Sequence, residues 1–490
     1  MPDRLSAATL GGLPAEVERP SYDLGRVDIG VVHLGIGAFH RAHQAAVFDA
    51  ALRSGDPRWG IIGVSLRSAS VRDQMVPQDG LYTLLERSDA GQQARIIGAV
   101  RDVLVAPEGP DRVVAALTLP TVHIVTLTVT EKGYHLDPAT GRLREGDAEI
   151  VADLADLSAP RSVPGFLVAG LAARRAAGLP PFTIISCDNI PHNGPRLRAA
   201  VLAVAQAHDP ALAEWIAEEG AFPQTMVDRI VPATTDDDIA ALAHDIGVED
   251  RAMVKTEPFL QWVIEDRFCG PRPDFAAFGV QLTTEVAPWE EAKLRLLNGA
   301  HSGIAYLGGL AGVERVDQFV ALPEGRAFVE ALWDESATTL SPPPGLDIAT
   351  YRDRLMARFA NSTLAHRTRQ IAMDGSQKLP QRLVAPILAR RAKGEPVDAL
   401  VLAVAAWMRW QAGVDDAGEP FTVDDPLAGD TAAAMAGARD ANERVAALLS
   451  IGAIFPAAFG QDAALVALLG RALEALEEGG ALATLRSHPE

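Results

Sequence analysis

The chain has 490 residues, of which 48% are hydrophobic and 22% are charged, so it carries enough apolar surface for two or three folded cores and is not disordered. Forty-four basic and 64 acidic side chains give a formal net charge of −20, which repels nucleic-acid backbones and anionic membrane surfaces. We therefore expect neither a nucleic acid nor a membrane as a partner.

Cysteine use and the N-terminal sequence predict a cytoplasmic protein. Cys187 and Cys269 are the two cysteines and no CxxC motif occurs, so a disulfide framework and a Cys-rich zinc site are both excluded. The N-terminus lacks the apolar core of a signal peptide, and no apolar run approaches the ~18–20 residues of a membrane span. No heptad repeat is present, so we expect a monomer or a weak homo-oligomer.

Short β-rich apolar runs alternate with helical patterns from about Asp28 to Ser186, which is typical of βαβ units and a parallel sheet. Apolar residues recur at three- and four-residue spacing in the expected helices Ala42–Ser54 and Pro164–Ala177. The expected strands are Ile29–Leu34, Trp59–Ser65, Arg95–Val100, His123–Val129 and Phe182–Ser186. This pattern predicts an α/β fold with a Rossmann-type, doubly wound sheet.

Strand signals nearly vanish beyond about Pro288, where segments rich in Ala, Leu and Arg have a helical period. A last β-like run, Val280–Val286, precedes this change. The expected helices include Leu400–Trp410, Ala432–Leu449 and Ala463–Leu476. We therefore predict a Rossmann-type domain over residues 21–286 and a mainly helical domain over residues 287–490.

The segment IGVVHLGIGAFHRAHQA places a glycine turn, Gly35-Ile36-Gly37, between a buried-type strand and a helix. A nucleotide pyrophosphate needs close backbone approach and free N–H groups at a helix N-terminus, and glycine permits both. Ala38 and Phe39 continue the turn, and His40 stands where the usual third glycine would be. A merely structural turn, or a methyltransferase that binds S-adenosylmethionine, is the alternative interpretation.

The end of the second expected strand lacks the acid that usually holds the ribose 2′-hydroxyl of NAD. Arg67 follows that strand and suits a 2′-phosphate, so these residues lean toward NADP and leave the coenzyme open. His40 and His43, three residues apart, allow a metal pair, but we expect them to be surface histidines and expect no metal.

A lysine, an asparagine and a histidine follow one another in PWEEAKLRLLNGAHSG, Pro288–Gly303. On an α-helix with Lys293 at zero, Glu290 lies at about 60°, His301 at about 80° and Asn298 at about 140°, which predicts one shared face. Alcohol oxidation needs a base, and a lysine in a desolvated cleft can serve. We therefore predict Lys293 as the base, with Asn298 and His301 on the reacting oxygen.

A second donor to that oxygen is Asn189, which follows the strand ending at Ser186. The competing interpretation of the lysine segment is a salt-bridged helix with an internal cap, or a helix that ends at Asn298-Gly299. Asn189 is equally explained as a turn residue before Pro191. Two other classes of oxidoreductase are excluded. The short-chain type needs Tyr-x-x-x-Lys, and no tyrosine has a lysine four residues on. A zinc alcohol dehydrogenase needs cysteine and histidine ligands, and no such cluster is present.

The chain resembles the mannitol dehydrogenase family of polyol-specific long-chain dehydrogenases from about Ser21 to Leu485. The segments that carry this resemblance are GIGAFHRAHQA (35–45), TLTVTEKGYH (126–135), SCDNIPHNG (186–194), MVDRIVPAT (226–234), EPFLQWVIED (257–266) and the lysine segment. The resemblance implies an N-terminal dinucleotide domain, a mainly helical C-terminal domain and a site between them. It also implies hydride transfer without a metal and favours NAD, although NADP stays open.

The resemblance implies a role for each matching residue. Lys293 is the base, Asn189 and Asn298 form the oxyanion hole, His301 touches the substrate, and Glu290 relays the proton of the lysine to solvent. Asp228 lies near the nicotinamide and the substrate. The predicted coenzyme-binding residues are Gly35, Ile36, Gly37, Ala38, Phe39, Arg67, Thr130, Glu131 and Asp228.

The family divides by substrate into enzymes of neutral polyols and fructuronate reductase, which interconverts D-fructuronate and D-mannonate. The segment His366–Leu383, HRTRQIAMDGSQKLPQRL, is more similar to the fructuronate reductase version. Lys378, with Arg369 and Arg382 in reserve, supplies charge for a carboxylate, although Lys378 is equally able to bind a hydroxyl. The alternatives are a mannitol 2-dehydrogenase or related polyol dehydrogenase and, from another class, an inactive nucleotide-binding sensor.

Overall fold

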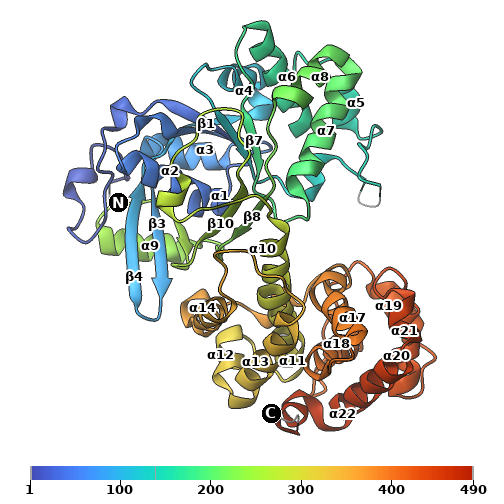
Figure 1. The fold of residues 1–490 in the computed structure, drawn as a ribbon. Helices are drawn as coiled ribbons and strands as arrows, with labels where there is room; N and C mark the ends of the chain where they lie inside the picture. The colour runs from blue at the N-terminus through green and yellow to red at the C-terminus, as the bar shows by residue number, and fades with distance from the viewer. Residues whose placement is uncertain (1–2, 138–139, 488–490) are drawn as a thin grey trace. The chain divides into compact units, whose positions relative to one another are not determined.

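The structure is a computed structural model that describes residues 3–137 and 140–487; residues 138–139 of the first predicted domain and 488–490 of the second lie outside it. The chain divides into two compact units, Met1–Val286 and Ala287–Glu490 (Figure 1). Within the described residues, no helix is both long enough and apolar enough to span a lipid bilayer.

The N-terminal unit is built on a five-stranded parallel sheet in the order β5-β2-β1-β6-β7. Its strands are β1 (Ile29–Leu34), β2 (Gly60–Ser65), β5 (Val100–Val105), β6 (Ile124–Leu127) and β7 (Thr183–Ser186). Because β1 lies in the middle and the chain runs outward from it in both directions, the sheet is doubly wound. The predicted Rossmann-type fold is confirmed.

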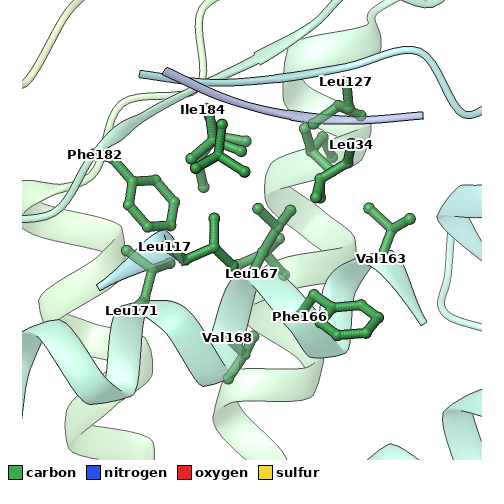
Figure 2. Close-up of a cluster of buried hydrophobic side chains, with 14 of the residues drawn as sticks. Leu34, Leu117, Leu127, Val163, Phe166, Leu167, Val168, Leu171, Phe182 and Ile184 are labelled. Atoms are coloured by element: carbon green, nitrogen blue, oxygen red, sulfur yellow. The ribbon is translucent and has the colours of Figure 1, made fainter. Parts of the chain in front are cut away.

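Both faces of this sheet are covered by helices, as the alternation of its side chains requires. Figure 2 shows Leu34, Leu127 and Ile184 packed against Leu167 and Leu171 of α6 (Val163–Ala176). The neighbouring strand residues point to the other face, where they pack with residues of α2 (Gln44–Arg53). The residues of this second face are Val31, Ile61, Ile124, Ile185, Phe48 and Leu52.

Two smaller sheets complete the N-terminal unit. An antiparallel hairpin of β3 (Tyr82–Ser88) and β4 (Gly91–Ile97) pairs with β9 (Val254–Thr256). The third sheet has the order β11-β10-β8 and consists of β8 (Thr225–Asp228), β10 (Gln261–Glu265) and β11 (Gln281–Thr283).

The predicted strand Arg95–Val100 is wrong, because the chain leaves one sheet and enters another within it. β4 ends at Ile97 and β5 begins at Val100. Between them, Gly98 packs so closely that an added Cβ would lie 2.8 Å from the Leu24 side chain. The apolar run therefore belongs to two strands with a tight connection, which its composition did not reveal.

The C-terminal unit is mainly helical, as predicted. At its centre, α11 (Gly299–Leu310) and α18 (Asp398–Trp410) pack together, and α22 (Ala463–Ser487) packs against both. All residues of α11 are buried. The predicted helix Ala432–Leu449 is wrong, since it is two helices, α19 (Ala428–Met435) and α20 (Ala441–Leu449). The side chain of Asp440 accepts a hydrogen bond from the N–H of Glu443 and is the N-cap of α20.

Candidate active site

The glycine turn follows β1 directly and leads into α1 (Ala38–Ala42). Gly35 has φ +94°, and an added Cβ would lie 2.2 Å from the carbonyl oxygen of Thr128. A side chain is therefore excluded at Gly35 by conformation and by contact. At Gly37, by contrast, the nearest atom to an added Cβ is 3.8 Å away, so the space in front of the turn is open.

A cavity of about 560 Å³ opens in front of the glycine turn. Its wall includes Gly35–Gly37, Ser65–Ser68 and Thr128–Thr130, which lie at or just after the carboxyl ends of β1, β2 and β6. Doubly wound sheets bind dinucleotides at this edge, beside the point where the strand order reverses. The size of the cavity suits a nucleotide coenzyme. Arg67 stands in this wall, and Ser65, the last residue of β2, is not followed by an acid.

The loop after β6 is held by Asp188. One carboxylate oxygen of Asp188 accepts bonds from the N–H groups of Val129 (2.9 Å) and Thr130 (2.8 Å), and the other accepts from the Tyr134 hydroxyl (2.8 Å). Thr130 has φ +67°, a strained conformation that these bonds stabilise. Burial raises the pKa of the Asp188 carboxyl, while its hydrogen bonds oppose the rise. Asp188 thus shapes one wall of the cavity, a role that the sequence analysis missed.

Asn189 is exposed in the loop after β7, beside Asp188. This loop is tied to β8 through the side chain of Asn193, which donates to the carbonyls of Asp188 (3.1 Å) and Thr225 (3.0 Å). β8 ends at Asp228, which is buried. The N-terminal unit therefore joins the segments that carry the two predicted residues Asn189 and Asp228.

Four predicted coenzyme residues do not belong to the described wall of the cavity. They are Ala38, Phe39, Glu131 and Asp228. The Phe39 ring stacks on His43, with the ring centroids 5.0 Å apart, and Glu131 forms an ion pair with Arg196 (3.2 Å).

The prediction that His40 and His43 are surface histidines is wrong, because both are fully buried. The His40 ring stacks on His33 with centroids 3.4 Å apart, beneath the glycine turn, and His43 Nε2 bonds the carbonyl of Gln261 (2.9 Å). Burial lowers the pKa of His33 to about 3 and that of His40 well below its usual value. His33 and His40 are therefore neutral core residues, and His43 lies buried beside them because α1 packs inward.

The lysine segment of the C-terminal unit is a π-helix, Lys293–Asn298, between α10 (Ala287–Ala292) and α11. The N–H of Gly299 donates to the carbonyl of Leu294, five residues earlier, which is the π-helical pattern. The expected placement at 100° per residue is therefore wrong for this segment, and so is a helix end at Asn298-Gly299.

The π-helix changes how Lys293 and Asn298 relate to each other. Since π-helical hydrogen bonds join residues i and i+5, these two residues stand about one helical turn apart. Lys293, Asn298 and His301 are 6%, 8% and 7% exposed. Glu290 precedes the π-helix and is half-buried. The sequence analysis predicted these residues as site residues, but it did not predict the π-helix that sets the spacing of the lysine and the asparagine.

His301 lies in an aromatic and cationic environment. Its ring centroid is 4.8 Å from that of Phe359 and 5.2 Å from that of His366. Burial, aided by the neighbouring His366 and by the charges of Arg358, Arg382 and Lys378, lowers the pKa of His301 well below its usual value. Its Nε2 is buried and has no hydrogen-bond partner among the described residues. His301 is therefore a neutral imidazole that can bond a polar group.

The two predicted carboxylate ligands have different surroundings. Lys378 donates to the carbonyl of Met373, and burial lowers its pKa. Arg369 pairs with Asp415 (3.6 Å) and lies over the Phe421 ring, with 5.2 Å from its guanidinium carbon to the ring centroid. The charge of Lys378 contributes to the lowered pKa of His301.

Comparisons with known proteins agree with this architecture. The mannitol dehydrogenase Rossmann domain model matches residues 29–277, and the mannitol dehydrogenase C-terminal domain model matches residues 285–477. The uncharacterized oxidoreductase YeiQ of Escherichia coli (strain K12) is 45% identical over 449 residues, which cover 90% of this chain and 91% of that protein.

Two further relatives have names that state an activity. The D-mannonate oxidoreductase of Escherichia coli (strain K12) is 44% identical over 471 residues, covering 95% of this chain and 96% of that protein. The Pseudomonas fluorescens mannitol 2-dehydrogenase, solved as a ternary complex with NAD and D-mannitol, is 38% identical with a TM-score of 0.84, and 99% of each chain is covered. With both family models matched in order along it, this chain belongs to the mannitol dehydrogenase family.

Proposed function

We propose that this chain is an NAD(H)-dependent oxidoreductase that interconverts D-mannonate and D-fructuronate, the alcohol and the ketone of one linear sugar acid. The observation that carries the proposal is the π-helix of the C-terminal unit, which presents two buried side chains, Lys293 and Asn298, about one turn apart. A base and a hydrogen-bond donor are the two groups that the oxidation of an alcohol requires from a protein.

The coenzyme-binding part of the proposal rests on the glycine turn. The open space at Gly37 and the cavity of about 560 Å³ suit a dinucleotide, whose pyrophosphate would lie against residues 35–37. NAD is proposed because the Pseudomonas fluorescens relative was solved with it. When bound, this coenzyme accepts or donates the hydride. Arg67 in the cavity wall makes NADP the second coenzyme to test.

The chain's own residues manage the proton and the oxygen. Lys293 removes the hydroxyl proton during oxidation and returns it during reduction, and Glu290 passes that proton on to solvent. Asn298 donates a hydrogen bond to the oxygen as negative charge develops on it, and Asn189 of the N-terminal unit supplies the second donor. His301, kept neutral by burial, orients the same oxygen or an adjacent hydroxyl.

A sugar acid is proposed as the substrate because of the charges around His301. Lys378, Arg358 and Arg382 all act on this histidine, so a substrate carboxylate nearby would gain charge-assisted hydrogen bonds. The D-mannonate oxidoreductase relative is consistent with such a substrate. The second candidate is D-mannitol and D-fructose, which the Pseudomonas fluorescens relative favours.

The decisive experiment crosses two coenzymes with two ketones. NADH and NADPH are each combined with D-fructuronate and D-fructose, and consumption of the reduced coenzyme is followed by absorbance. We expect the highest kcat/KM with NADH and D-fructuronate. A higher kcat/KM with D-fructose would replace the sugar acid by the neutral polyol and leave the roles of Lys293 and Asn298 unchanged. No consumption with either ketone would contradict the proposed function.

A further inference from the structure

Arg382 lies beside the candidate catalytic segment of the C-terminal unit. It belongs to a second π-helix, Pro380–Val384, which packs against the first, Lys293–Asn298. The two segments approach closely at Gly299, where an added Cβ would lie 3.1 Å from the carbonyl oxygen of Arg382. Nη1 of Arg382 donates to the carbonyl of Asn298 (3.4 Å) and to the hydroxyl of Ser302 (3.2 Å).

The guanidinium of Arg382 differs from its cationic neighbours in having no acid to balance it. Arg369 pairs with Asp415, and the charges of Asp374 and Asp425 act on Lys378. Among the described residues, no carboxylate forms an ion pair with Arg382.

The electrostatic surroundings of Arg382 agree with this. The group that acts on its charge is the phenol of Tyr306, whose own pKa is raised by burial, so that it is neutral near pH 7. Burial lowers the pKa of Arg382 to about 10, which still leaves it charged. A half-buried and uncompensated cation is costly, and an anionic ligand would relieve that cost.

The donor geometry of Arg382 also suits a carboxylate. Nη1 is anchored by Asn298 and Ser302, whereas no described residue accepts a bond from Nε or Nη2. These two nitrogens form the planar fork that binds both oxygens of a carboxylate, which a lysine ammonium cannot reproduce. The anchor therefore turns the fork away from the backbone of the predicted oxyanion-hole residue.

We propose that Arg382 is the specificity-determining residue that binds the carboxylate of the substrate and selects sugar acids over neutral sugars. This rests on the proposed function, because it assigns one end of the substrate to the site that holds Lys293 and Asn298. Lys378, which is bonded to backbone carbonyls, is left to bind hydroxyl groups. Arg369 is left outside the site, with its charge balanced by Asp415.

The test compares two ketones that differ in one group. D-Fructuronate has a carboxylate where D-fructose has a hydroxymethyl group, at the end of the chain far from the carbonyl. In Arg382→Met, which keeps an apolar stem of similar length, we expect kcat/KM for D-fructuronate to fall about 10- to 100-fold, mainly through KM. For D-fructose, which loses only the support that Nη1 gives to Asn298, we expect a smaller fall, so the ratio of kcat/KM for D-fructuronate to that for D-fructose should drop about 10-fold or more. Arg382→Lys should recover part of the loss, since it restores the charge without the fork.

Two further measurements make the outcome unambiguous. Arg391→Met removes an arginine that pairs with Asp462, between α21 (Ala457–Gln461) and α22, and it should leave the reactions of both ketones unaffected. Calorimetric titration of D-mannonate and D-mannitol into the coenzyme-loaded wild type and Arg382→Met needs no turnover, so it tests Arg382 even if the proposed reaction is wrong. Tighter binding of D-mannonate that disappears in Arg382→Met supports the proposal. An equal loss for both ketones, or no preference for D-mannonate, overturns it.

Discussion

The glycine turn of the N-terminal unit and the π-helix of the C-terminal unit are built in opposite ways. In the turn, main-chain atoms form the site, and the side chain of Gly35 is absent because the carbonyl of Thr128 occupies its place. In the π-helix, side chains would supply the proposed chemistry, and an irregular backbone places Lys293 and Asn298 about one turn apart. A site made of backbone depends on conformation, whereas a site made of side chains depends on single functional groups.

This difference predicts how each region responds to substitution. A change in the glycine turn should act on stability or on coenzyme affinity, since the turn does no proton transfer. A change in the π-helix should act on turnover and leave the coenzyme bound.

The largest effect is expected for Lys293→Ala. Removing the base should lower kcat about 10²- to 10⁴-fold, which is the usual contribution of a general base. The Kd of NADH, measured by fluorescence titration, should change less than about twofold, because the coenzyme site belongs to the N-terminal unit. Lys393→Ala is the matched control, since Lys393 is exposed and its Nζ donates to the Thr338 carbonyl. Unchanged turnover in Lys293→Ala would remove the lysine from the mechanism.

A pair of glycine substitutions should separate fold from binding in the N-terminal unit. Gly35→Ala puts a Cβ 2.2 Å from a backbone carbonyl at φ +94°, so we expect it to lower the free energy of unfolding by about 2–3 kcal/mol. Gly37→Ala meets no atom closer than 3.8 Å, so stability should change by less than about 0.5 kcal/mol. Its methyl group instead points at the open space, and NADH should bind more weakly.

Urea unfolding and NADH titration of both variants check this pair. If Gly37→Ala binds NADH as well as the wild type does, the pyrophosphate does not lie against this turn. If Gly35→Ala is fully stable, the backbone of the turn relaxes, and the contrast between a backbone site and a side-chain site weakens.

The features that could be predicted from sequence are those with local signals. The strands of the large sheet alternate between its two faces, and a glycine turn after a buried strand has a known geometric meaning. The lysine segment was also identified from its residue types. In each case the residues that carry the signal lie within about twenty positions of one another.

The features that were missed depend on distant contacts. Asp188 holds the N–H groups of Val129 and Thr130, 59 and 58 residues away, and nothing in its neighbourhood indicates those bonds. The π-helix has no periodic signal of its own, since the segment reads equally well at 3.6 residues per turn. His40 was expected at the surface, whereas it is buried in the core with its ring stacked on that of His33. Tertiary packing decided all three.

The smallest predicted effect concerns pH and contrasts the two units again. Glu335 of α13 (Pro323–Ala337) accepts bonds from the N–H groups of Ala399 and Leu400, both 2.9 Å, at the start of α18. Burial raises its pKa from 4.5 to about 7. The folded chain therefore holds this proton more tightly than the unfolded chain. The stabilisation is fully present below about pH 4.5 and is lost as the pH rises through about 7.

Urea unfolding at pH 5 and pH 8 tests this sign. The wild type should lose about 1–2 kcal/mol more than Glu335→Gln between the two pH values, because glutamine does not titrate. Glu330→Gln, on the exposed side of the same helix, should behave like the wild type.

The pH dependence that His33 of the N-terminal unit contributes has the opposite sign. Its pKa is lowered to about 3, so its contribution to stability is lost as the pH falls. Acid should therefore weaken the N-terminal unit while it protects the helical one. An identical pH dependence in wild type and Glu335→Gln would show that the carboxylate is already accommodated by the two N–H groups, whose partial positive charge would then outweigh the cost of burial.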